Sequence, residues 1–309
     1  MIPKRLTIAA LLAASAASAH PASFDTSRLN QLFSELARRQ SLFASGVLES
    51  RQSVWLVDAD DQRSALEFAR LLTRTPVGGA RARRMALHFE EEMLRELGDA
   101  RQTLWVLHES PLGRKLSEIP LEPGASLGNP KPSSRRGMQV YGFKQGVAAH
   151  YDQMAGTLRL REDEADSAFG FRVEHQDPTL DGFALLAAFK QGERRISYSS
   201  DSDNSLIVKL RGRQLENYHF DMVGGHYLLA TVAISNDGAS TLSQSHFGHY
   251  GRLGEQRLAA PMCRLDIARQ DGERHLVRLR TVVKWEPRQL ARREIEIRIP
   301  RGTDVVREH

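Results

Sequence analysis

Cysteine is almost absent from this sequence, since Cys263 is the only one among 309 residues. A single thiol cannot form an intramolecular disulfide, and a chain of this length can bury enough apolar surface to fold without one. Cys263 alternates with Arg264 in a strand-like segment, so we interpret it as a small buried apolar residue rather than a reactive thiol.

Long apolar runs and blocks of one charge are also missing. After the N-terminus no window approaches the about 20 apolar residues that a membrane helix needs, so no integral membrane span is predicted. The formal net charge of +5 is mild, and its basic residues are interleaved with acids. No Lys/Arg block lies beside stacking aromatics, so nucleic acid is not an expected partner.

Sequence motifs of enzymes are missing too. There is no G-x-S-x-G nucleophile motif, no phosphate-binding loop with its lysine, and no complete zinc motif. His88 has Glu91 and Glu92 at helical spacing, but the second histidine of a zincin is lacking. We therefore predict a protein that is not an enzyme and needs no cofactor.

The N-terminus has the pattern of a secretory signal peptide. Lys4 and Arg5 precede an apolar run over residues 6–14, and small residues end at Ala19. The run is too short to span a bilayer, and the A-x-A ending predicts cleavage before His20. No cysteine follows the run, which excludes a lipid-anchored lipoprotein. The mature chain, with net charge +5 − 2 = +3, is expected in the periplasm or outside the cell.

Residues 20–125 have the pattern of a helix-rich segment. Apolar residues repeat at helical spacing over residues 28–39, 63–73 and 80–97. Two short apolar runs around tryptophan, Ser53–Val57 and Thr103–Leu107, predict strands that either pair with each other or join a later sheet. Proline, glycine and serine concentrate over residues 111–137, which predicts a linker, and we place the domain boundary at residues 126–137.

From residue 138 to 309 the period of the apolar residues is two, which predicts an antiparallel meander. The fold class is therefore α+β: the helix-rich segment plus a large antiparallel sheet, which at this number of strands is expected to curl into a half-barrel or incomplete barrel. The predicted strands are Gln139–Phe143, Val147–Asp152, Thr157–Glu162, Ala168–His175, Phe183–Lys190, Arg194–Ser199, Leu206–Gly212, Gln214–Met222, His226–Ser235, Thr241–Gly248, Ala259–Arg269, Arg274–Trp285 and Ile295–Ile299.

Four histidines lie close together in this region, at positions 219, 226, 246 and 249. A metal site would need three or four ligands to converge, with Asp221 or Asp237 in support. Positions i and i+3 of a strand point to opposite faces, so His246 and His249 could share a metal only across a bulge at Gly248. Solvent-facing histidines are the expectation, and no metal site is predicted.

Apolar stripes are the remaining candidate site. In the last long strand Val277, Leu279, Val283 and Trp285 are expected to share one face. Such stripes are either ordinary core or the wall of a cavity for an apolar ligand. The predicted ligand-binding residues are Phe169, Phe171, Val208, Leu210, Val277, Leu279, Val283 and Trp285.

The C-terminal third resembles the periplasmic family of the outer-membrane lipoprotein-sorting carrier. The features that carry the resemblance are Tyr250, Gly254 and Pro261 at a strand entry, the turn at Asp271 and Gly272, and the closing residues 295–306; the first helix, with Leu29, Leu32, Leu36 and then Phe43, is also similar. The resemblance implies an incomplete antiparallel barrel with helices on its concave apolar face. It also implies carriage of lipid or lipoprotein acyl chains.

Three functions follow as hypotheses. The first is a non-enzymatic periplasmic binding or carrier protein whose partner is an apolar ligand or protein segment. The second is an extracytoplasmic metal-dependent hydrolase that uses the cluster from His219 to His249. The third is a structural envelope-assembly module with an envelope protein as its partner.

Overall fold

The structure is a computed structural model that describes residues 26–42, 44–73, 81–123, 131–144, 147–162, 185–186, 195–199, 204–212, 214–236, 240–253, 258–269 and 274–308. The predicted signal peptide and the predicted strand Ala168–His175 lie outside these residues. Of the predicted strand Phe183–Lys190 only Leu185 and Leu186 are described, and their backbone is helical. None of the helices in the described ranges is long and apolar enough to cross a membrane.

The three helices predicted from the apolar period are present as α2 (Thr26–Leu42), α3 (Ala59–Thr73) and α4 (Ala82–Leu97). The stripe of α2 buries Leu32 and Leu36 completely, and that of α4 does the same for Ala86 and Met93. Helix α4 has no acidic residue in its first turn, so its end charges do not favour it, and packing on the sheet stabilises it instead.

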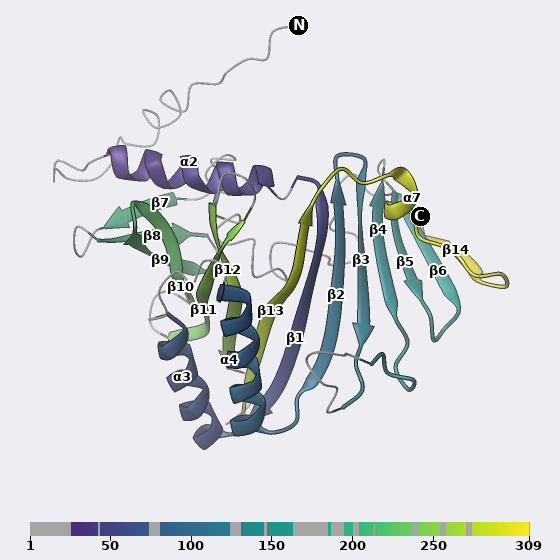
Figure 1. Ribbon diagram of the computed structural model, residues 1–309, viewed down its shortest axis with the longest axis horizontal. Coiled ribbons are helices and arrows are strands. Elements are labelled where there is room, and N and C mark those ends of the chain that lie inside the picture. Colours follow the sequence, from purple (N-terminus) through teal and green to yellow (C-terminus); the bar gives the residue numbers. More distant parts are fainter. Residues whose placement is uncertain are drawn as a thin grey trace, which may run out of the picture.

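In the part of the chain that the structure describes, the strands form one mixed sheet of fourteen, in the order β14-β6-β5-β4-β3-β2-β1-β13-β12-β11-β10-β9-β8-β7 (Figure 1). Among the described strands, β14 and β6 are the one pair that is parallel. The strands are β1 (Gly46–Val57), β2 (Arg101–Ser110), β3 (Gly113–Pro120), β4 (Gln139–Lys144), β5 (Val147–Asp152), β6 (Thr157–Glu162), β7 (Arg195–Ser199), β8 (Ser205–Arg211), β9 (Leu215–Val223), β10 (His226–Asn236), β11 (Ser240–Leu253), β12 (Leu258–Arg269), β13 (His275–Pro287) and β14 (Asp304–Glu308).

The sheet is open, and the expected curl into a half-barrel is not seen. Closing a sheet requires its first and last strands to approach each other, whereas β14 and β7 end the strand order on opposite sides. The right half of the sheet in Figure 1 is a broad twisted layer. The meander is also broken, because β6 and β7 follow each other in the chain but lie at the two ends of the sheet.

The two tryptophan strands lie at the centre of this sheet. Strand β1 pairs with β2 on one side and with β13 on the other, so the predicted alternatives both occur. Strand β3 lies inside the segment predicted as a linker, and that prediction is wrong for residues 113–120. Pro120 is the last residue of the strand, where a missing backbone donor is tolerated. The division of the chain at residues 126–137 stays a prediction.

The predicted closing strand Ile295–Ile299 is also wrong. Residues 292–295 form a short helix, α7, and residues 296–300 have no regular structure. Strand β14 follows instead and pairs with β6. The alternation of Ile295, Ile297 and Ile299 has no strand partner among the described residues. Ile295 packs with Val47 and Ile297 packs beside Val140, whereas Ile299 is 49% exposed.

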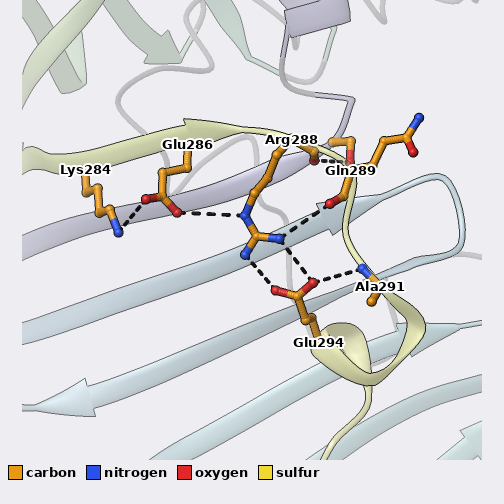
Figure 2. Close-up of polar contacts among 7 residues, drawn as sticks. Lys284, Glu286, Arg288, Gln289, Ala291 and Glu294 are labelled. Carbon is orange, nitrogen blue, oxygen red and sulfur yellow. Dashed lines mark hydrogen bonds and ion pairs between the residues drawn. The ribbon is translucent and has the colours of Figure 1, made fainter.

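Figure 2 shows the polar contacts that shape this connection. The carboxylate of Glu294 accepts two hydrogen bonds from the guanidinium of Arg288, at 2.6 and 3.1 Å, and a third from the Ala291 backbone N–H at 2.9 Å. The bonds from Arg288 and then from Ala291 lower the pKa of Glu294 to about 2. A carboxylate that accepts from the backbone three residues earlier stabilises the start of a helix, which explains the turn of helix here.

Two main apolar clusters form the core. One joins α3 and α4 to the central strands, and the other joins α2 to strands β8 to β11. Between α4 and β1 lies a buried ion pair, with Arg51 Nε 3.9 Å from Glu90 Oε1. The Ser53 hydroxyl donates to the same carboxylate at 2.8 Å. Burial raises the pKa of Glu90 although Arg51 and Ser53 oppose this.

Candidate functional site

The two faces of the sheet can be told apart from its register. Side chains directly opposite on neighbouring strands share a face, and successive residues of a strand alternate between faces. Ser53 contacts Glu90 of α4, so Ser53 and its partner Leu279 lie on the face that α3 and α4 cover. We call this the α3/α4 face. Gln52 and its partner Arg280 therefore lie on the opposite face.

The structure does not bring the predicted ligand-binding residues to one surface. Val277 and Leu279 are fully buried on the α3/α4 face, in the core with α3 and α4. Val208 and Leu210 are fully buried in the cluster that contains α2. Phe169 and Phe171 lie outside the described residues. Whether any of these residues contacts a ligand stays a prediction.

A β-bulge separates the last two predicted residues. Strand β1 pairs Ser50 with Val282 but Glu49 with Lys284, so the register passes over Val283. One extra residue in a strand shifts the alternation of its side chains, so that the residues beyond it point to the opposite faces of the sheet. Trp285 therefore lies opposite Leu48, on the other face from Leu279. The expectation that Val277, Leu279, Val283 and Trp285 share a face is wrong for this reason.

On the opposite face a row of large apolar side chains crosses five neighbouring strands. Register pairs join Trp285 of β13 to Leu48 of β1, then to Leu107 of β2, Leu116 of β3 and Tyr141 of β4. Val282 and Trp105 lie beside this row, because both are opposite Ser50. We call these seven residues the apolar band: Leu48, Trp105, Leu107, Leu116, Tyr141, Val282 and Trp285.

Four residues of the band, Leu48, Leu107, Leu116 and Val282, are 1–8% exposed and belong to the same apolar cluster as residues of α3 and α4. By the register of the strands, however, the band lies on the opposite face of the sheet from these helices. Helices α3 and α4 are on the other face, and α2 packs with β8 to β11. Helix α7 also packs on the α3/α4 face, since Ile295 contacts Val47, the neighbour of Leu48. The two tryptophans of the band and Tyr141 are only half-buried. Tyr141 stacks on His150 of β5 with ring centroids 4.6 Å apart, which extends the aromatic surface by one strand.

Next to the band the same face becomes strongly polar. Arg264 of β12 lies directly opposite Arg280 of β13, and Asp266 lies opposite Arg278. Arg280 is 2% exposed, and its Nε donates to Gln52 Oε1 at 3.0 Å. Since Arg280 and Val282 are two residues apart on one strand, the polar cluster adjoins the band. We call Arg264, Asp266, Arg278 and Arg280 the arginine cluster.

Among the residues that the structure describes, Asp266 is the carboxylate that contacts the arginine cluster. Arg264 Nε is 2.6 Å from Asp266 Oδ1, and its Nη2 donates to the Ser245 hydroxyl at 3.2 Å. Its guanidinium carbon also lies 5.4 Å from the centre of the Phe247 ring. Burial opposes ionisation of Asp266, but Arg264 and Arg280 hold its pKa below the usual value. The cluster thus holds an ionised carboxylate beside its three guanidinium groups.

The four histidines do not form a metal site. Among the described residues no group of three histidine, cysteine, aspartate or glutamate side chains could hold a metal ion. His219 and His226 are partly exposed and lie near the carboxylates of Asp221 and Glu35. His246 and His249 are instead largely buried, so the expectation that they face solvent is wrong, and burial lowers the pKa of each to about 4.

The irregular residue of the H-x-x-H segment is His249 rather than Gly248. The register of β11 with β12 continues without a shift from the pair Gly248–Cys263 to the pair Tyr250–Pro261, but the backbone of His249 between them has a φ of +51°. The backbone turn brings the imidazole of His249 to 5.4 Å from the Phe89 ring of α4. The histidine is therefore packed in the core beneath the helices. Cys263 is buried as predicted, and burial raises the pKa of its thiol.

Fold and site together define an α+β protein with one broad open sheet, helices over part of each face, and a largely buried row of apolar side chains beside an arginine cluster. No protein-family model and no curated protein matches the chain. Its structure is similar to those of an outer membrane lipoprotein-sorting protein domain from Vibrio parahaemolyticus (9% identity, TM-score 0.43, 86% of this chain and 96% of that one) and a LolA superfamily protein from Nitrosomonas europaea (8%, 0.44, 86% and 98%). A DUF1329 family protein from Desulfovibrio piger is similar at the same level (7%, 0.45, 85% and 95%).

Proposed function

We propose that this protein is a non-enzymatic carrier that binds an apolar ligand, a lipid or lipoprotein acyl chain, on the apolar band. The observation that carries the proposal is the row from Trp285 to Tyr141, which puts five large apolar side chains side by side on a face away from α3, α4 and α7. Such a row runs perpendicular to the strands and can lie along an extended chain.

The affinity would come from removing apolar surface from water. Each methylene that is buried contributes about 0.8 kcal/mol, so ten methylenes give a gross gain of about 8 kcal/mol before the cost of ordering the chain. The tryptophans offer large rigid contact surfaces, and their rings lose little conformational freedom on binding. No bond is made or broken in this mechanism.

The predicted residues beneath the helices would take part only after a movement. Val208 and Leu210 become accessible if α2 leaves its strands, and Val277 and Leu279 if α3 and α4 leave theirs. A swing of one of these helices would enlarge the site for loading or close it for discharge. Carriage in the periplasm, after removal of the predicted signal peptide, agrees with the resemblance of the C-terminal motifs.

The three tryptophans allow a direct test, because they lie on different faces. Saturable binding of a lipid with a brominated acyl chain should quench the fluorescence of Trp105 and Trp285, which belong to the band. Trp55 is 3% exposed in the core under α3 and α4 and should not be quenched.

The variants then separate the faces. The pair Trp105→Phe with Trp285→Phe should lose the quenching, and the matched control Trp55→Phe should keep it. Native mass spectrometry of protein purified from cells should also show a bound lipid. Quenching that persists in the double variant and disappears in the control would place the ligand on the other face, and no saturable quenching would overturn the carrier proposal.

A further inference from the structure

We infer that the carboxylate of Glu118, on β3 between Trp105 of β2 and Tyr141 of β4, binds an ammonium group at the head of the apolar ligand. The inference rests on the proposed function and adds the chemical class of the ligand to it. It depends on three observations about the face that carries the apolar band: an acid without a basic neighbour, polar side chains that are directed away from it, and two partly accessible aromatic rings beside it.

Glu118 has no basic neighbour on its face of the strands β2, β3 and β4. It lies directly opposite Trp105 of β2 and Gln139 of β4. Residues two positions along β3, and those diagonal to Glu118 on the paired strands, share its face. All of these are uncharged: they are Thr103, Leu107, Leu116, Pro120 and Tyr141.

The carboxylate of Glu118 forms no hydrogen bond or ion pair within the described part of the chain. Burial raises its pKa, and no basic group among the described residues opposes this shift. Other acids on the same face do have partners. Glu109 Oε1 lies 3.3 Å from Arg114 Nη2, and Asp152 Oδ1 accepts the Met154 backbone N–H at 2.9 Å. Glu118 is therefore the acid of this region that is available to a ligand.

The polar side chains beside Glu118 are directed to other partners. His150 Nε2 lies 2.6 Å from Gln139 Oε1, and Gln139 also hydrogen-bonds the side chain of Asp152. The Nε1 of Trp105 is buried and has no hydrogen-bond partner, so the indole does not donate to Glu118 either. A ligand that binds the Glu118 carboxylate would therefore break no existing bond to it.

Trp105 and Tyr141 give the site its aromatic surface. Both are half-buried, so each keeps a surface that a ligand can contact. Burial raises the pKa of the Tyr141 hydroxyl, and the negative charges of Glu118 and Asp152 raise it further. An ammonium group is attracted both to a carboxylate and to the face of an aromatic ring. An anionic head group would instead be repelled by Glu118.

The position of the site indicates an amphiphile. Trp105 and Tyr141 belong to the apolar band as well, so an ammonium group at Glu118 lies beside apolar surface on both neighbouring strands. An alkyl chain on the ammonium group can lie against these two rings without contact to the fully buried members of the band. The ligand class is thus an amphiphile with a primary or quaternary ammonium head.

The test measures binding by calorimetry with three probes: octyltrimethylammonium, 1-octanol and tetramethylammonium. These represent the whole amphiphile, its chain alone and its head alone. The wild-type protein should bind octyltrimethylammonium about tenfold more tightly than octanol, because a cation–π contact and an ion pair together correspond to roughly that factor. Glu118→Gln should lose most of this preference.

Two further variants control for charge. Glu118→Asp keeps the negative charge and should retain at least half of the logarithmic preference. Glu109→Gln removes an acid from the same face that is paired with Arg114, and it should leave the preference unchanged. The unfolding midpoint of Glu118→Gln should not fall below that of the wild type, because burial disfavours the charge that is removed.

The outcomes separate the two proposals. Quenching by the brominated lipid without a preference for octyltrimethylammonium, or with a preference that Glu118→Gln leaves intact, would overturn the ammonium site while the carrier proposal stands. No quenching and no binding of either octyl compound would overturn the carrier. Tetramethylammonium that binds in a Glu118-dependent way when neither octyl compound binds would indicate a site for a free ammonium ion and overturn the amphiphile assignment.

Discussion

The buried ion pair between α4 and the central strand allows a quantitative test of how this helix is held. Glu90 is 0% and Arg51 is 2% exposed, and Ser53 donates to the same carboxylate. Replacing Glu90 by leucine leaves the Arg51 charge buried without this partner, which costs about 3–5 kcal/mol in comparable cases. Burial raises the pKa of Glu90, so the ionised carboxylate is itself poorly solvated here.

Replacing both partners should be far less costly. In the double variant Glu90→Leu with Arg51→Met no charge is left behind, and such exchanges are often neutral or stabilising by about 1–4 kcal/mol. The double variant should therefore be more stable than Glu90→Leu alone. The exposed neighbour Glu91 provides the matched control, because Glu91→Leu loses only a surface contact with His88 and should cost under about 1 kcal/mol.

Urea unfolding followed by tryptophan fluorescence measures these differences, since Trp55 lies in the core beneath α3 and α4. With a slope of about 2–3 kcal/mol per M, Glu90→Leu should lower the midpoint by about 1–2 M. The slope itself should stay constant, because the surface exposed on unfolding is unchanged. A double variant that is no more stable than Glu90→Leu would refute the reasoning that the stranded arginine causes the loss.

Two other predictions concern the strand beneath these helices. Burial lowers the pKa of His246 and His249 to about 4 from the value of 6.5 for an exposed histidine, so the unfolded chain takes up protons at a higher pH than the folded protein. The free energy of unfolding should therefore fall as the pH drops from about 6.5 to 4, by roughly 2 kcal/mol per histidine at pH 5. His246→Leu should make this pH dependence weaker, which urea unfolding measured at each pH would show. Gly248→Ala should lower the unfolding midpoint by the equivalent of about 2 kcal/mol, because its Cβ would meet the backbone oxygen of Leu72 in α3. The control Gly251→Ala should lower stability less, because its Cβ would meet only the flexible side chain of Met262. Equal losses of stability in the two variants would contradict this account.

The helices and most strands could be predicted from periodicity. The stripes that contain Leu32 and Met93 repeat at helical spacing, and the strands from β4 to β6 and from β8 to β13 alternate in the printed sequence. These signals are local. Local contacts also explain where periodicity fails. Residues 295–299 alternate like a strand, but Glu294 accepts hydrogen bonds from Arg288 and from the Ala291 backbone, and these bonds stabilise a helical turn instead.

The order of the strands could not be predicted, and the candidate site depends on it. Leu48 is far from Leu107 and Trp285 in sequence and becomes their neighbour only because β1 is inserted between β13 and β2. The bulge at Val283 has no sequence signal, yet it decides the face of Trp285. The arginine cluster requires the register of β12 and β13. The sequence predicts the apolar strands around Trp55 and Trp105, but it does not predict which face of the sheet each tryptophan lies on.

The pairing of β1 with β13 has a consequence for how the chain can fold. These two strands join a half that contains β2 to β6 to a half that contains β7 to β12, and the contact between Gln52 and Arg280 spans 228 residues of sequence. Contacts of such separation are slow to form. The pairing of β1 with β13 cannot form until residues 275–287 are available. In a chain that is still being synthesised or exported, the two halves of the sheet are therefore not yet joined. The apolar band, which includes Val282 and Trp285 of β13, can be completed only after that strand has been made.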